Sequence, residues 1–69
     1  MSGETVTRLE RFEAPYRREI TLDNVEFDSG MRLLRITIRE GRRFTILDVD
    51  ASTAARWGSA LANWAEQAG

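Results

Sequence analysis

Apolar residues recur at every second position through the middle of the chain, a period typical of half-buried β-strands. The even positions from Phe12 to Leu22 begin this pattern. Pro15 interrupts it, and because proline cannot donate a ladder hydrogen bond, we expect the secure strand to start near Tyr16. The phase changes at Asp23-Asn24, which predicts a bulge or a tight bend there.

The N-terminal residues carry a weaker pattern. Residues 1–7 are small and polar, and we expect them to be frayed. Residues 8–14 fit a loop, a short turn or an additional edge strand, and the sequence leaves these alternatives open.

Two further strands are predicted, from Met31 to Glu40 and from Arg43 to about Val49, each following a glycine-containing turn. Short turns between consecutive strands favour an antiparallel meander. In the longer strand the even positions are apolar, and the odd positions are mostly polar. The apolar set is Leu34, Ile36 and Ile38, and the other set is Leu33, Arg35, Thr37 and Arg39.

The last segment predicts one amphipathic helix, capped by Asp50 or Ser52 and continuing to about Gln67. Its apolar stripe consists of Trp57, Leu61, Trp64 and Ala68. Since two tryptophans are the largest apolar side chains available, we expect this stripe to pack across one face of the sheet. The predicted fold class is therefore α+β: a three-stranded, or possibly four-stranded, antiparallel meander and a C-terminal helix, forming one domain over residues 8–69.

A second ridge of the helix carries only small residues: Ala51, Ala54, Ala55, Gly58, Ala62 and Ala65. A glycine in the middle of a helix costs about 1 kcal/mol relative to alanine, so its presence suggests the close approach of another backbone. Two interpretations are open: contact with the sheet of the same chain, or helix–helix contact in a homodimer.

The composition excludes much chemistry. The 69 residues include no cysteine, histidine or lysine, so the chain alone builds no disulfide, thiolate metal site, catalytic triad or Schiff base. We therefore expect no enzyme, no cofactor and no metal site. No apolar run approaches the length of a membrane span, and the first residues lack a signal-peptide pattern. These features predict a cytoplasmic, bacterial protein.

One short motif resembles an enzyme family. The segment Ile46–Ser52 is similar to the nucleophile motif of the haloacid-dehalogenase phosphatases, which implies Asp48 as nucleophile and Asp50 as acid/base. That family needs a doubly wound sheet, and the residues after Asp50 form only one helix. Helix capping by Asp50 or Ser52 explains the motif more simply.

Arginine is the only basic residue, with ten arginines against eleven acidic residues and a net charge of -1. A surface on the predicted sheet is the candidate binding site, formed by Met31, Leu33, Arg35, Thr37, Arg39 and Arg43. The alternative is that Arg35 and Arg39 pair with Glu19, Glu26 or Glu40 across strands.

Two resemblances extend this interpretation. The run Gly41-Arg-Arg-Phe-Thr-Ile-Leu-Asp, followed by Thr53-Ala-Ala-Arg-Trp-Gly and Asn63-Trp-Ala, resembles a small uncharacterised proteobacterial family. The strand–strand–strand–helix layout over residues 17–67 is also similar to the positive-cofactor family of transcriptional coactivators. That second resemblance implies a dimer that binds single-stranded DNA through its sheet.

The leading hypothesis is a non-catalytic protein-binding or regulatory module that forms a homodimer. The alternative is a single-stranded nucleic-acid binder that uses the arginines of the sheet, with Tyr16 or Phe44 stacking on bases. The partner is therefore the protein itself, another protein or, second, a single-stranded nucleic acid, and no membrane.

Overall fold

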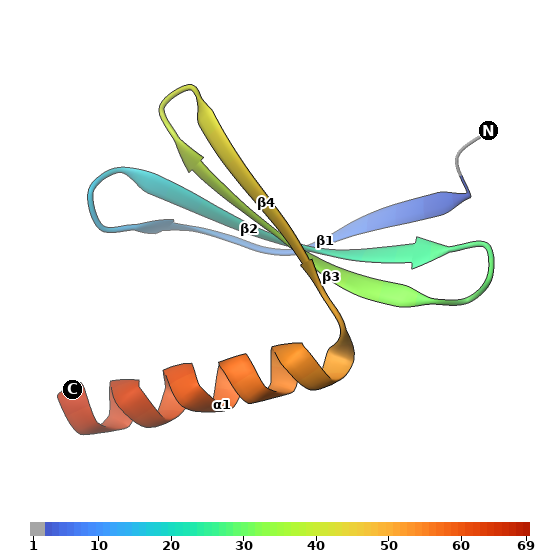
Figure 1. Cartoon of the computed structure of the whole chain (residues 1–69). Helices are drawn as coiled ribbons and strands as arrows, with labels where there is room; N and C mark the ends of the chain where they lie inside the picture. The colour runs from blue at the N-terminus through green and yellow to red at the C-terminus, as the bar shows by residue number, and fades with distance from the viewer. Residues whose placement is uncertain (1–2) are drawn as a thin grey trace.

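The computed structural model describes residues 3–69 as a four-stranded sheet followed by one helix (Figure 1). The elements are β1 (Glu4–Ala14), β2 (Arg18–Phe27), β3 (Arg32–Glu40), β4 (Arg43–Val49) and α1 (Ala51–Ala68). The strands lie in the order β1-β2-β3-β4, and each pair is antiparallel. The predicted α+β class and antiparallel meander are confirmed, and the meander has four strands.

The N-terminal segment is a full edge strand. Residues 4–7 belong to β1 and pair with β2, so the expectation of a frayed segment is wrong for them, while Met1 and Ser2 lie outside the described residues. The bulge is in β1, between Arg8 and Glu10, and not at Asp23-Asn24 of β2. The extra residue, Leu9, breaks the period of two, which is why the sequence pattern did not identify this strand.

The β1–β2 turn has an unusual backbone. Pro15, Tyr16 and Arg17 connect the paired residues Ala14 and Arg18, so β2 begins two residues later than expected. Tyr16 and Arg17 have φ angles of 65° and 60°, a left-handed conformation that side chains disfavour. The β3–β4 turn instead places Gly41 at a φ of 60°, where glycine is well suited.

The register gives the sheet two unlike faces. One face, here called the apolar face, carries Phe12, Ile20, Leu22, Leu34, Ile36, Ile38 and Leu47. The opposite face, here called the polar face, carries Arg11, Glu19, Thr21, Asp23, Arg35, Thr37 and Arg39. Only two hydrophobic side chains of the described residues are buried, Val25 at 0% exposure and Val49 at 7%. Val25 lies on the polar-face side, between Val6 and Leu33.

The helix follows β4 directly and diverges from the sheet (Figure 1). Asp50 is its N-cap, since the Asp50 side chain accepts a hydrogen bond of 2.9 Å from the Thr53 amide. No residue of α1 is buried, and its contact with the sheet is mainly with β3. Trp57, Leu61 and Trp64 are 40%, 59% and 70% exposed. The expectation that this stripe packs across the sheet is therefore wrong, because the short connection at Asp50 directs α1 away at an angle.

The chain on its own is extended for its size. Its radius of gyration is 13.8 Å, whereas a compact domain of this length has about 11 Å. Its accessible surface is 5855 Å² for a mass of 7.9 kDa, whereas a folded monomer of this mass exposes about 4,400 Å². The sheet and α1 together therefore leave roughly 1,400 Å² more surface in water than is usual.

Candidate interaction surfaces

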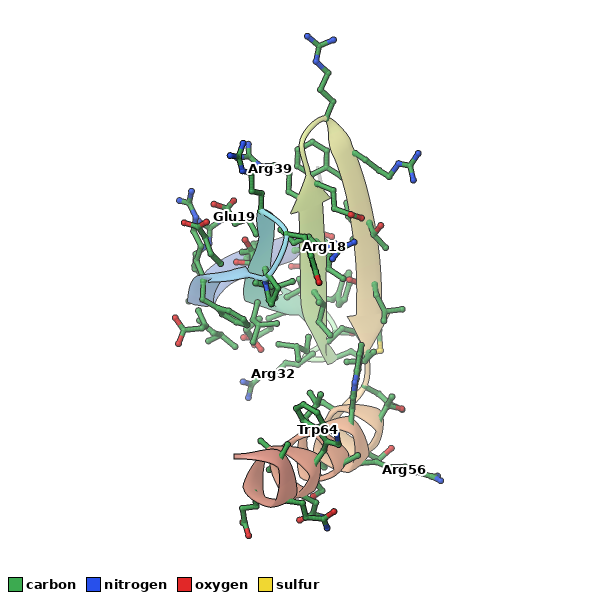
Figure 2. All side chains as sticks on the ribbon, turned by 90° about the vertical axis from the view of Figure 1, so that its left-hand side faces the viewer. Arg18, Glu19, Arg32, Arg39, Arg56 and Trp64 are labelled. Atoms are coloured by element: carbon green, nitrogen blue, oxygen red, sulfur yellow. The ribbon has the colours of Figure 1, made fainter. Side chains whose placement is uncertain are left out.

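The most apolar feature of the described residues is an open cleft of about 300 Å³ between the apolar face and α1. The sheet lines it with Phe12, Ile20, Leu22, Leu34, Ile36, Ile38 and Val49, and the helix lines it with Ala54, Trp57, Gly58 and Leu61. Figure 2 shows Trp64 on the side of α1 nearest the sheet, while Arg56 extends away from it. The two apolar surfaces thus face each other without closing on each other.

The small-residue ridge lies partly in this cleft. Ala54 is half-buried, Gly58 lines the cleft beside it, and the rest of the ridge (Ala51, Ala55, Ala62, Ala65) is exposed. A Cβ atom built on Gly58 meets nothing within 4 Å. The glycine therefore does not accommodate the sheet of its own chain, and that interpretation of the ridge is wrong.

The polar face is held by ion pairs within the chain. One row across all four strands carries charges of alternating sign, because each residue of the row faces the next one on the neighbouring strand. The row consists of Arg8, Asp23, Arg35 and Asp48. The Arg35 guanidinium donates to both carboxylate oxygens of Asp48, at 2.9 and 3.1 Å, and lies 3.6 Å from Glu4. This hydrogen bonding by Arg35 lowers the pKa of Asp48 below its ordinary value.

Arg39 belongs to a second group of charges on the same face. Its guanidinium lies 4.0 Å from Glu19, which also accepts hydrogen bonds of 3.0 and 2.7 Å from Arg11. The hydrogen bond from Arg11 is the main cause of the lowered pKa of Glu19. Figure 2 shows Arg39 and Glu19 side by side on the sheet, far from the helix. Pairing of Arg35 and Arg39 with carboxylates is therefore present, with Glu19 as one predicted partner and with Asp48 and Glu4 as partners that the sequence did not indicate.

The predicted binding surface is not one continuous patch. Arg35, Thr37 and Arg39 share the polar face, and Leu33 is half-buried beside Val25. Met31 is exposed in the β2–β3 turn, where its carbonyl accepts a 2.9 Å hydrogen bond from the Phe27 amide. Arg43 pairs in register with Glu40 and points to the side of the apolar face, so its assignment to the arginine surface is wrong.

Two turns form a basic end of the sheet. The β1–β2 and β3–β4 turns lie side by side there, because Arg18 pairs with Glu40, which in turn pairs with Arg43. Arg17, Arg42 and Arg43 form no ion pair with another described residue. Tyr16 is 88% exposed at the turn, with the Arg18 guanidinium 5.7 Å from its ring centre. The turn that presents Tyr16 and Arg17 depends on two consecutive positive φ angles. A pattern of hydrophobic and polar residues does not reveal such angles.

Residues 3–69 offer no further binding feature of two common kinds. No group of three or more acidic side chains among them is arranged to hold a metal ion. Helix α1 is not apolar enough to cross a membrane.

These features describe a small α+β module with one ion-paired face and one open apolar face. Residues 3–67 match a protein family described as "Family of unknown function (DUF6967)", and the chain belongs to this family. No curated protein and no solved structure matches the chain.

Proposed function

We propose that this domain is a non-catalytic protein-binding module whose first partner is a second copy of itself. The observation that carries the proposal is the open cleft between the apolar face and α1. Its walls are almost entirely hydrophobic, and they include Trp57 and Leu61 of the helix stripe. An apolar surface of this extent on a small chain is typical of a protein contact.

The amount of exposed surface favours a second copy as the occupant. The excess of roughly 1,400 Å² per chain falls in the range that each subunit of a stable, obligate dimer buries. The net charge of -1 gives little repulsion between copies. Because each copy offers both a sheet face and a helix stripe, two copies present matching apolar surfaces to each other.

Stability gives a second, independent reason. With only Val25 and Val49 buried among the hydrophobic residues of the described chain, one copy lacks the core that a domain needs. The chain has no cysteine for disulfide bonds. Association remains the available source of additional apolar burial.

The test is the mass in solution of the wild-type chain and of Gly58→Leu. At micromolar concentration the wild type should sediment at about twice 7.9 kDa. The Cβ atom of a leucine at position 58 meets no atom of its own chain within 4 Å, and the rest of the side chain occupies the cleft, so this variant should sediment as a monomer. Ser59→Leu is the matched control, since it adds a leucine to the next position of α1 outside the cleft, and it should remain a dimer. A wild-type chain that is monomeric under these conditions would refute the proposal.

A second candidate function rests on the basic end of the sheet. Arg17, Arg42 and Arg43 lack ion-pair partners among the described residues and flank an exposed tyrosine, a combination suited to a single-stranded nucleic acid. Binding of a short oligonucleotide should weaken roughly 50-fold between about 50 and 200 mM salt if four phosphates are contacted. Changing Arg42 and Arg43 together to glutamate should abolish it, whereas Arg56→Glu on the helix should not. Absence of binding at low salt would remove this candidate.

A further inference from the structure

The two edges of the sheet differ in how they are protected. β1 carries five charged residues and the bulge at Leu9, and both features hinder the addition of another strand. β4 has neither a bulge nor a central charge, because its middle residues are Phe44, Thr45, Ile46 and Leu47. No described element covers its outer side. β4 is therefore the edge that is open to a further strand.

Exposed apolar side chains accompany this open edge on both faces. Phe44 and Ile46 project from the polar face, and Ile46 is 62% exposed although it is β-branched and apolar. Leu47 projects from the apolar face and is also exposed. An edge strand that faces only water normally keeps polar residues on at least one face, so this composition favours a neighbouring strand.

The backbone geometry determines which residues could pair. The two-residue turn at Gly41-Arg42 closes with a hydrogen-bonded pair of Glu40 and Arg43. Since hydrogen-bonded and non-hydrogen-bonded pairs alternate along an antiparallel ladder, Phe44, Ile46 and Asp48 direct their backbone groups toward the open edge. A second β4 strand can meet these groups over its full length in one antiparallel register, which places Ile46 opposite Ile46 of the second copy.

The side chains fit this register. It brings Thr45 opposite Leu47 of the other copy in two equivalent places, and it places Arg42 near Asp50 of the other copy just beyond each end of the paired strands. Arg42 has no ion pair within the described chain, and Asp50 is acidic and exposed. Opposite charges at facing positions stabilise strand pairing, so the charges favour a second copy in this register.

We infer that two copies of this chain join through antiparallel pairing of β4 with β4, with Ile46 at the two-fold axis, to form a continuous eight-stranded sheet. The inference rests on the proposed self-association and specifies where it occurs. The two-fold axis is perpendicular to the sheet, so both apolar faces lie on the same side. Both α1 helices then lie on the side of this combined apolar layer, where the helix stripe of each copy covers the apolar face of the other copy, so Gly58→Leu in the cleft interferes with the same assembly.

Cysteine cross-linking tests the register, because the natural chain has no cysteine. Residues 45 and 47 of different copies form a non-hydrogen-bonded pair, with a Cα separation of about 4.5 Å that a disulfide can span. The double variant Thr45→Cys, Leu47→Cys should therefore give a covalent dimer on mild oxidation, seen by non-reducing electrophoresis and intact mass. Each single variant is the control. Its two cysteines, one from each copy, lie two positions out of register and about 7–8 Å apart, so they should not cross-link.

A substitution at the axis gives a second readout. Ile46→Glu places two like charges opposite each other and should convert the sedimenting species to a monomer. Ile46→Thr keeps a β-branched residue and should remain dimeric. A wild-type dimer whose double-cysteine variant does not cross-link would overturn the β4 pairing and leave self-association intact. A monomeric wild type would overturn both proposals, and equal cross-linking of the single variants would overturn the register.

Discussion

The two faces of the sheet differ in whether their side chains find interaction partners within the chain. On the polar face, Arg35 finds Asp48 and Glu4, and Arg39 finds Glu19, so the charges are neutralised within one chain. On the apolar face, the side chains meet only an open cleft, and Trp57 and Trp64 of α1 are exposed. One chain therefore provides enough electrostatic partners for its own charges but not enough apolar partners for its own hydrophobic side chains. The surface that needs a partner is therefore the hydrophobic one.

The largest expected effect comes from the tightly packed side of the sheet. Val25→Ala removes the most buried hydrophobic side chain and should lower the free energy of unfolding by roughly 2–3 kcal/mol. Phe12→Ala on the apolar face is the comparison, and in dilute solution it should cost only about 1 kcal/mol. Chemical denaturation at two protein concentrations measures both. A larger loss for Phe12→Ala only at high concentration would indicate that this face is covered by association.

The sequence predicted the parts of the fold whose signal is local. Period-two spacing identified β3, an apolar run after a glycine-containing turn identified β4, and the spacing of Trp57, Leu61 and Trp64 identified α1. β1 was not assigned because Leu9 shifts its phase by one residue. The position of α1 was wrong for a different reason. An amphipathic pattern states that a helix face requires burial, but it does not state which chain provides the cover.

The candidate site was predictable to a similar degree. The alternation of β3 correctly separated Arg35 and Arg39 from Ile36 and Ile38. The partner of Arg35 was not predictable, because Asp48 becomes its neighbour only through the β3–β4 register. In a meander, the length of each turn determines which residues of neighbouring strands face each other. A turn that is one residue longer or shorter would change every charge pair between those two strands.

The next effect is a gain of stability at the β1–β2 turn. Arg17→Gly should raise the free energy of unfolding by up to about 1 kcal/mol, because glycine adopts positive φ without steric cost. The same change at Arg42, whose φ is not positive, is the control and should not stabilise the fold. Thermal unfolding monitored by circular dichroism compares the two variants. An equal response of both would show that the turn is not strained.

The smallest effect is the acid sensitivity of the polar face. The pKa of Glu19 is lowered from 4.5 by its hydrogen bond from Arg11, and that of Asp48 from 3.8 by its hydrogen bonds from Arg35. A carboxylate with a lowered pKa in the folded state adds stability above its unfolded pKa, and this stability is lost as the pH falls through the folded value. The denaturation midpoint should thus be constant from about pH 8 to pH 5 and fall below about pH 4. Asp48→Asn removes one of these two carboxylates and should reduce this fall.

The central claim is that a second copy covers the apolar face and the stripe of α1. Tryptophan fluorescence tests it directly, since Trp57 and Trp64 are the only indoles of the chain and both belong to that stripe. Emission should be blue-shifted at micromolar concentration and should move to the red as dilution separates the copies. Emission typical of water-exposed indoles at every concentration, with the sheet still folded, would contradict it.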